Sequence, residues 1–165
     1  MNNDIKVVCI TRVRNEEWIL ERFLRCAELW ADHIILADQH SEDRSEEIAR
    51  KFSKVSVVKS DVQKLDAYIN RKADILLNEV DKIKGEKLLI TLDADEMLTA
   101  NFSTSPEWQT CLTASHGTTL YFKWINLYKD THMYWFSDQY FGWGLKVGEN
   151  KKISEALSSH NTKNV

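Results

Sequence analysis

The stretch Lys87-Leu88-Leu89-Ile90-Thr91-Leu92, followed directly by Asp93-Ala94-Asp95-Glu96, does most to decide the fold. A largely apolar run of this length is typical of a strand buried on both faces, as in a parallel sheet. The acids that follow repel one another when ionised, and a bound cation relieves that repulsion. The stretch therefore indicates a strand whose terminal carboxylates either bind a metal ion or form a solvated turn that caps the next helix.

Earlier segments of the chain alternate between strand and helix patterns. Strands are predicted at Ile5–Thr11, His33–Ala37 and Val55–Lys59. Helices are predicted after Asn15, where apolar residues recur at helical spacing as far as Trp30, and at Ser45–Phe52 and Lys64–Lys84, the last closed by Gly85. This order is the pattern of an α/β domain with a mostly parallel sheet and right-handed crossovers.

Polar turns follow three of these strands. In parallel α/β sheets ligands bind outside the carboxyl ends of the strands, so the turns Thr11–Asn15, Asp38–Asp43 and Asp93–Glu96 are expected to line one crevice. The chain contains neither GxGxxG nor GxxxxGKS/T. This disfavours both a dinucleotide-binding Rossmann domain and a P-loop nucleotidase.

The sequence changes character after Glu96. Ser105 before Pro106 predicts the start of a helix over Glu107–Ser115. Ten aromatic residues lie between Tyr121 and Trp143. We expect most of these rings to complete the core from the far side of the sheet. The alternative is an aromatic-lined trough for the apolar faces of sugars or for lipid. Residues 151–165 are polar and pattern-poor, which predicts a frayed tail.

The composition is that of an ordinary single globular domain. The 165 residues are 43% apolar and 28% charged, with a net charge of −3 that argues against broad binding to nucleic acid. Cys9, Cys26 and Cys111 lack metal or redox spacing and are expected to be buried, reduced thiols. Without a leader pattern or about 18 consecutive apolar residues, the expected location is cytoplasmic, with peripheral contact at the inner face of the plasma membrane as the membrane alternative.

The polar turns are informative in their own sequence. Asp38-Gln39-His40-Ser41-Glu42-Asp43-Arg44-Ser45 resembles the Asp-Asp-Gly-Ser-Thr-Asp-Gly-Thr turn of family 2 glycosyltransferases, the large group with the GT-A fold. Arg14-Asn15-Glu16-Glu17 is similar to the family's Tyr-Asn-Glu-Glu stretch, and Leu92-Asp93-Ala94-Asp95-Glu96 resembles its Leu-Asp-Ala-Asp-Asp metal motif. Order and spacing agree over about residues 5–100. The resemblance implies a Rossmann-like three-layer sandwich with a mostly parallel central sheet and helices on both faces.

This resemblance also implies an activity. The expected enzyme moves a sugar from a nucleotide diphosphate sugar, first of all a UDP-sugar, to a hydroxyl of a saccharide or lipid-linked acceptor. Inversion at the sugar and a place in cell-surface polysaccharide or lipopolysaccharide synthesis are part of the same expectation. One GT-A-like domain would divide into a nucleotide-sugar-binding half at about 1–100, an aromatic-rich acceptor-side half at about 101–150, and the tail 151–165.

The resemblance assigns four residues to the nucleotide-sugar site. Asp38 would accept a hydrogen bond from the base, Val13 and Arg14 would border the base and the ribose, and Asn15 would belong to the same nucleotide-sugar site. The same residues have simpler interpretations. Asp38 could be a turn residue, and Arg14 a surface charge.

Further roles follow for the diphosphate and the sugar. Asp93 would lie near the ribose or sugar, and Asp95 would hold Mn²⁺ or Mg²⁺. Arg71 would help to stabilise the charge that grows on the departing diphosphate, or it could be a salt-bridge partner on the long helix. The catalytic base is fixed by no motif. Asp138 is the best candidate, followed by Asp130 and Glu149.

Departures from the family pattern keep other interpretations open. Arg12-Val13-Arg14 replaces the common Pro-Thr-Tyr, and Gln39-His40 replaces Asp-Gly, so the donor base is open. The short stretch after Glu96 leaves a truncated or non-catalytic nucleotide-sugar-binding module as the alternative function. A phosphatase of the haloacid-dehalogenase type is disfavoured, because Met97 stands where its motif has Thr or Val and because that motif follows the first strand.

Overall fold

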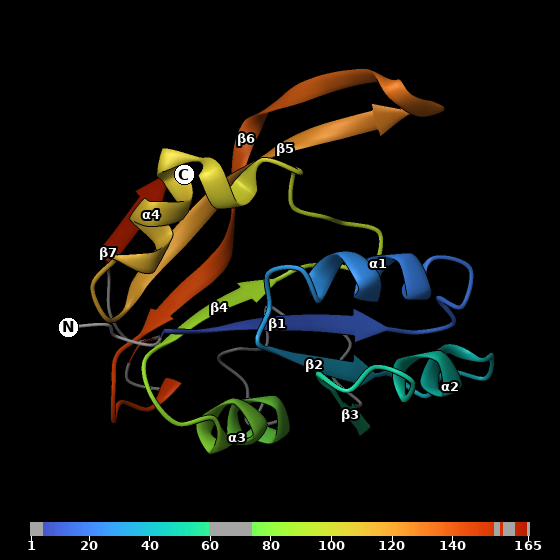
Figure 1. Cartoon of the computed structure of the whole chain (residues 1–165), viewed down its shortest axis with the longest axis horizontal. Helices are drawn as coiled ribbons and strands as arrows, with labels where there is room; N and C mark the ends of the chain where they lie inside the picture. The colour runs from blue at the N-terminus through green and yellow to red at the C-terminus, as the bar shows by residue number, and fades with distance from the viewer. Residues whose placement is uncertain (1–4, 60–73, 154–155, 157–160, 165) are drawn as a thin grey trace.

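The apolar stretch that ends in acids forms strand β4 (Lys87–Thr91), and every residue of it is buried. Four strands lie side by side and run parallel: β1 (Lys6–Val13), β2 (His33–Asp38), β3 (Val55–Lys59) and β4. They form part of a seven-stranded sheet in the order β3-β2-β1-β4-β6-β5-β7 (Figure 1). This computed structural model describes residues 5–59, 74–153, 156 and 161–164.

The remaining strands make the sheet mixed, although four of its six strand pairings in the described structure are parallel, as the sequence predicts for most of the sheet. β6 (Asp130–Val147) is antiparallel to β4 and to β5 (Thr118–Tyr128), whereas β7 (Asn161–Asn164) runs parallel to β5. The presence of β7 differs from the frayed tail predicted for residues 151–165, and Ile153 and Ala156 are buried as well. Strand pairing uses main-chain groups, so a polar segment without an apolar pattern can still add a strand.

Helices cover both faces of the sheet, as predicted (Figure 1). One face packs against α1 (Leu20–Ala27), α2 (Ser45–Ala49) and α4 (Pro106–Leu112), and the other against α3 (Asp74–Lys82). The two faces alternate along each strand because successive side chains of a strand point in opposite directions. Val7 and Cys9 of β1 therefore belong to the first core cluster, and Val8 and Ile10 to the second.

The capping signal is confirmed at α4 but wrong at α1, which begins at Leu20 with Ile19 rather than Asn15 at its N-cap position and has no side-chain cap. The Ser105 hydroxyl caps α4 by accepting a hydrogen bond from the Trp108 amide at 3.2 Å, as its position before Pro106 predicts. Gly85 has φ +91°, which suits the predicted turn after the long helix. Of the helix predicted at Lys64–Lys84, α3 accounts for the described part. Arg71 lies outside the described residues.

The β5–β6 hairpin extends beyond the rest of the sheet (Figure 1). It carries eight of the eleven exposed large hydrophobic residues in the described part of the chain: Ile125, Leu127, Tyr128, Met133, Tyr134, Trp135, Phe136 and Tyr140. The expectation that most aromatics complete the core is therefore wrong for these rings. In the described structure β6 pairs with β4 over Gly144–Val147. The earlier residues of β6 pair with β5 and extend past the parallel strands.

The cysteines behave as expected for reduced thiols. No disulfide joins them; Cys9 and Cys111 are buried and Cys26 is half-buried. Burial raises the pKa of Cys9, which keeps its thiol protonated and unreactive. Within the described ranges, no helix has the length and apolar character needed to cross a membrane.

Candidate functional site

The polar turns after β1, β2 and β4 leave the same edge of the sheet. Val13, the last residue of β1, pairs in register with Asp38, the last residue of β2. β4 also runs parallel to β1, and its last residue, Thr91, pairs with Ile10. Parallel strands in this register deliver their following turns to one side, which is the convergence that the sequence predicts.

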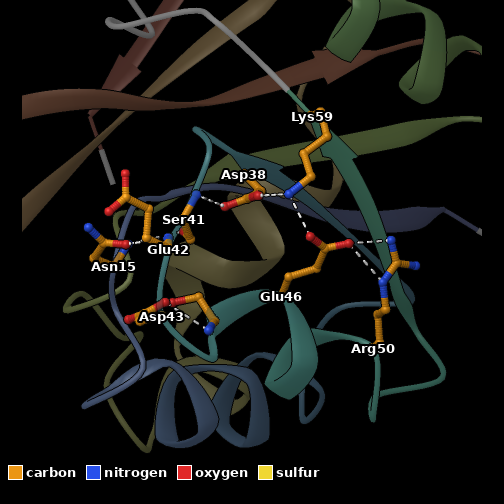
Figure 2. A network of polar contacts seen from close by, with 9 residues as sticks. Asn15, Asp38, Ser41, Glu42, Asp43, Glu46, Arg50 and Lys59 are labelled. Atoms are coloured by element: carbon orange, nitrogen blue, oxygen red, sulfur yellow. Dashed lines mark hydrogen bonds and ion pairs between the residues drawn. The ribbon is translucent and has the colours of Figure 1, made fainter.

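The turns after β1 and β2 are joined to each other by reciprocal hydrogen bonds. The Asn15 amide donates to the Ser41 hydroxyl at 3.1 Å, and the Glu42 amide donates to the Asn15 side-chain oxygen at 2.8 Å (Figure 2). A third bond of 2.9 Å runs from the Glu17 amide to Asp43. Asn15 and Asp43 therefore hold the two turns together, and their side chains are engaged within the protein.

The turn after β2 keeps a glycine-like backbone at the position where His40 departs from the family pattern. His40 stands where that pattern has glycine and adopts φ 58°, in the left-handed region that glycine enters most easily. Asn15 in the facing turn has φ 58° as well. The turn thus keeps a conformation that favours glycine although the residue has a side chain.

Asp38 lies at the centre of a charged network (Figure 2). One carboxylate oxygen accepts the Ser41 amide at 3.0 Å, and the other pairs with the Lys59 ammonium. Lys59 also bonds to Glu46 at 2.5 Å, and Glu46 pairs with Arg50 at 2.5 Å. Burial opposes ionisation of Asp38, but the hydrogen bonds from Lys59 and Ser41 outweigh it and hold its pKa below the usual value.

The burial of Asp38 limits what it can contact. Its side chain is fully buried, and each of its oxygens already accepts a donor from the protein. A nucleotide base could reach Asp38 only if Ser41 or Lys59 moved. In this structure Asp38 holds the turn after β2, and its contact with a base stays a prediction.

The acidic turn after β4 contains a second cluster. The Arg12 guanidinium from β1 pairs with Asp93 at 3.2 Å. The Asp93 amide donates to the Glu96 carboxylate at 2.9 Å, while the Glu96 amide donates back to the Asp93 carbonyl at 3.0 Å. Asp95, between them in the sequence, is exposed. The turn therefore holds Asp93 and Glu96 in place and leaves Asp95 facing solvent.

The pKa of Glu96 is shifted by burial and by the charges in this turn. Burial, together with the neighbouring charges of Asp93 and Asp95, raises its pKa to about 7, although the Asp93 amide and Arg12 oppose the shift. Burial is the largest cause of this shift, and the two neighbouring acids add to it. The sequence alone left Glu96 without an assigned role.

The metal site itself is not preformed. Among the described residues, no three His, Cys, Asp or Glu side chains are grouped as the ligands of one metal ion. Asp93, Asp95 and Glu96 nevertheless offer carboxylate oxygens, the ligand type that hard divalent cations prefer.

The other predicted site residues are dispersed. Val13 is 1% exposed, so its side chain belongs to the core and only its backbone reaches the site edge. Arg14 is exposed at that edge. Asp138 is exposed on β6, and within the described structure no hydrogen bond joins it to Asp93 or Asp95.

Two residues of the site went unassigned by sequence reasoning. In the sequence Arg12 is a departure from the family pattern without a predicted partner, because its pairing with Asp93 depends on β1 lying beside β4. Lys59 ends β3 directly opposite Asp38 in the register of β2 and β3. A signal for this pair was available in the sequence: Lys59 ends one predicted strand, and Asp38 directly follows the preceding one.

Comparisons with known proteins place the fold. No protein-family model and no curated protein matches the sequence. The structure of 4-diphosphocytidyl-2C-methyl-D-erythritol synthase matches over 98% of this chain and 87% of its own, with a TM-score of 0.56 and 12% identity. Glucosyl-3-phosphoglycerate synthase from Mycobacterium tuberculosis, in complex with Mn²⁺, UDP and glucosyl-3-phosphoglycerate, matches over 72% of this chain and 44% of its own, with a TM-score of 0.46 and 21% identity.

Mannosyl-3-phosphoglycerate synthase from Rubrobacter xylanophilus is a further match, over 72% of this chain and 40% of its own, with a TM-score of 0.47 and 15% identity. This chain thus spans less than half the length of the two phosphoglycerate synthases. At these identities the likeness concerns the fold alone. The chain has an α/β fold with a seven-stranded mixed sheet, distantly similar to GT-A and nucleotidyltransferase folds.

Proposed function

We propose that the protein is a metal-dependent glycosyltransferase that moves a sugar from a nucleotide diphosphate sugar to the hydroxyl of a saccharide or lipid-linked acceptor. A UDP-sugar is the first candidate donor. The observation that supports this most is the acidic turn after β4, in which Arg12 pairs with Asp93 beside exposed Asp95 and half-buried Glu96. This turn shares a sheet edge with the turns after β1 and β2, the edge at which parallel α/β sheets bind ligands.

The chain's own residues divide the work of binding the donor. Asp95, with Asp93 beside it, would hold Mn²⁺ or Mg²⁺, which when bound stabilises negative charge on a diphosphate. Arg12 keeps the Asp93 carboxylate oriented through their 3.2 Å ion pair. The exposed guanidinium of Arg14, at the same edge, can pair with a phosphate.

Transfer with inversion requires one bond exchange and one proton transfer. The acceptor oxygen bonds to the anomeric carbon of the sugar while the bond from that carbon to the diphosphate oxygen breaks, and the electron pair leaves with the diphosphate. A base takes the hydroxyl proton. Asp138 stays our candidate for this base.

Calorimetry tests the donor half of the proposal. UDP-, GDP- and dTDP-sugars are titrated into the protein with and without Mn²⁺, and we expect at least one to bind in a Mn²⁺-dependent manner. Asp95→Asn should weaken that binding at least about tenfold, since even partners outside the metal's direct ligands contribute this much. Glu21→Gln is the matched control, because Glu21 is an exposed carboxylate that pairs with Arg25 on α1, away from the acidic turn. Absence of Mn²⁺-dependent binding to all three donors would rule out the proposal.

A nucleotidyltransferase is the second candidate, favoured by the match to 4-diphosphocytidyl-2C-methyl-D-erythritol synthase over 98% of this chain. Such an enzyme would move a nucleotidyl group from a nucleoside triphosphate to a phosphate oxygen of its acceptor and release diphosphate. Release of diphosphate without any binding of nucleotide diphosphate sugars would favour this candidate. Donor binding without sugar transfer or donor hydrolysis would instead identify a binding module.

A further inference from the structure

A groove separates the β5–β6 hairpin from the segment formed by η3 (Phe102–Thr104) and α4. Its volume is about 460 Å³, within the range of about 300–1,000 Å³ typical of small-molecule sites. Leu98 and Thr99 line it and follow the acidic turn after β4 within three residues of Glu96. The groove therefore begins where the proposed donor site ends along the chain.

Aromatic rings form two opposed sides of this groove. Trp108 and Phe102 meet edge to face, with ring centroids 5.0 Å apart, on the η3–α4 side. Phe136 and Tyr140 line the hairpin side and are 56% and 44% exposed. The hairpin rings thus have apolar surface that the protein itself leaves uncovered.

Hydrogen-bonding groups accompany the rings. Asn101, Glu107 and Lys123 line the groove, and the Lys123 ammonium lies 5.4 Å from the centroid of Phe136. Glu107 and Lys123 are the charged residues of the described lining, and their charges are opposite. The lining is therefore close to neutral overall while it offers an amide, a carboxylate and an ammonium to a ligand.

This combination selects a class of ligand. A lipid tail would cover Asn101, Glu107 and Lys123 without giving them hydrogen-bond partners, which is unfavourable. A diphosphate would face the Glu107 carboxylate. A neutral sugar suits both features, because its C–H faces can lie against rings while its hydroxyl groups bond to the polar side chains.

We propose that the groove binds the acceptor of the transfer and that the acceptor is a neutral saccharide, held between Trp108 on one side and Phe136 and Tyr140 on the other. This inference rests on the proposed function, because it identifies the ligand of the groove with the group that receives the sugar. It assigns recognition of the acceptor to the part of the hairpin that does not contribute to the core.

Saturation-transfer NMR tests the groove directly. The probes are the methyl glycosides of glucose, galactose, mannose and N-acetylglucosamine, each at about 10 mM to detect millimolar affinity. Each is measured with and without UDP and Mn²⁺, and at least one is expected to bind. Phe136→Ala should weaken that binding about three- to tenfold, the usual contribution of an aromatic contact, and Tyr140→Ala should act likewise. Trp135→Ala is the matched control, because Trp135 is a neighbouring exposed aromatic that does not line the groove.

The outcomes separate this inference from the proposed function. Failure of all four glycosides to bind in both conditions overturns the saccharide site even if a UDP-sugar binds. Equal weakening by Phe136→Ala and Trp135→Ala, in variants whose circular dichroism is unchanged, also overturns it. Phe136-dependent glycoside binding in a protein that binds no nucleotide diphosphate sugar overturns the acceptor role, and then the proposed function fails on its own test.

Discussion

In the β1–β4 half of the sheet, polar side chains at the strand ends are held by other parts of the protein, whereas the outer β5–β6 hairpin presents large side chains to solvent. Asp38 is fully buried and paired with Lys59, while Leu127 is 60% exposed. The difference teaches that the fold itself supplies partners for the polar side chains of the turns after β1 and β2. On the proposed acceptor side, by contrast, the apolar surface of the β5–β6 hairpin is exposed, and a bound ligand would bury it.

Hydrogen exchange should show this contrast most strongly. The amides of Ile10 and Leu36 lie in central parallel strands, whereas Leu127 and Tyr134 pair only with each other's strand in the outer hairpin. We expect the hairpin amides to exchange at least about a thousandfold faster, because a protruding two-stranded hairpin opens without global unfolding. NMR-detected exchange measures each amide. Equal protection in the two regions would contradict the comparison.

Removal of one carboxylate from each region should lower the free energy of unfolding by different amounts. Asp38→Ala leaves Lys59 and the Ser41 amide without their buried acceptor, and we expect the free energy of unfolding to fall by about 2–4 kcal/mol. Asp138→Ala, on the exposed hairpin, should change it by less than about 0.5 kcal/mol. Urea unfolding followed by circular dichroism gives both values. A loss for Asp138→Ala as large as that for Asp38→Ala would show that the hairpin is equally integrated.

The pH dependence of stability should reveal the acidic turn after β4. The pKa of Glu96 is raised to about 7 in the folded protein, so folding favours its protonated form. That stabilisation is complete below the ordinary carboxyl pKa of about 4.5 and is lost as the pH rises through 7. Relative to Glu96→Gln, the free energy of unfolding of the natural protein should fall by about 1–2 kcal/mol over this pH interval. This figure is lower than the pKa shift alone would give, because solvent screens a half-buried group.

Unfolding curves collected at several pH values without divalent metal measure this loss. The matched control is Glu107→Gln, which changes an exposed carboxylate on α4 and should leave the pH dependence as it is in the natural protein. The same slope in the natural protein and in Glu96→Gln would assign the effect to another group.

The smallest expected effect concerns backbone strain. His40 has φ 58° in the turn after β2, and Lys129 has φ 61° at the tip of the hairpin. His40→Gly should raise the free energy of unfolding by about 0.5–1 kcal/mol, because glycine relieves more strain there than it costs in flexibility. Lys129→Gly should leave global stability nearly unchanged, since the tip opens locally. Thermal unfolding of both variants checks the pair, and a larger gain at Lys129 would reverse the comparison.

Local signals in the sequence predicted the elements but only part of the site. β3 has the predicted bounds, and Ser105 caps α4 as its position before Pro106 indicates. The convergence of the polar turns followed from strand order alone. The partners of the predicted residues did not follow: Arg12 and Asp93 are 81 positions apart, and Asp38 and Lys59 are 21 apart. Such pairs depend on which strands are adjacent and on their register. Local periodicity in the sequence predicts neither.

By itself the sequence determined that the chain is an α/β protein whose acidic turn follows a buried strand, because apolar runs, helix caps and turn residues act over a few neighbouring positions. Only the tertiary structure decided that β7 completes the sheet, that Asp38 is engaged by Lys59, and that the aromatic segment stands out as a hairpin. The sequence pattern of aromatic residues is the same whether their rings pack in the core or line a groove. The short overlap of β6 with β4 settles which of these the chain adopts.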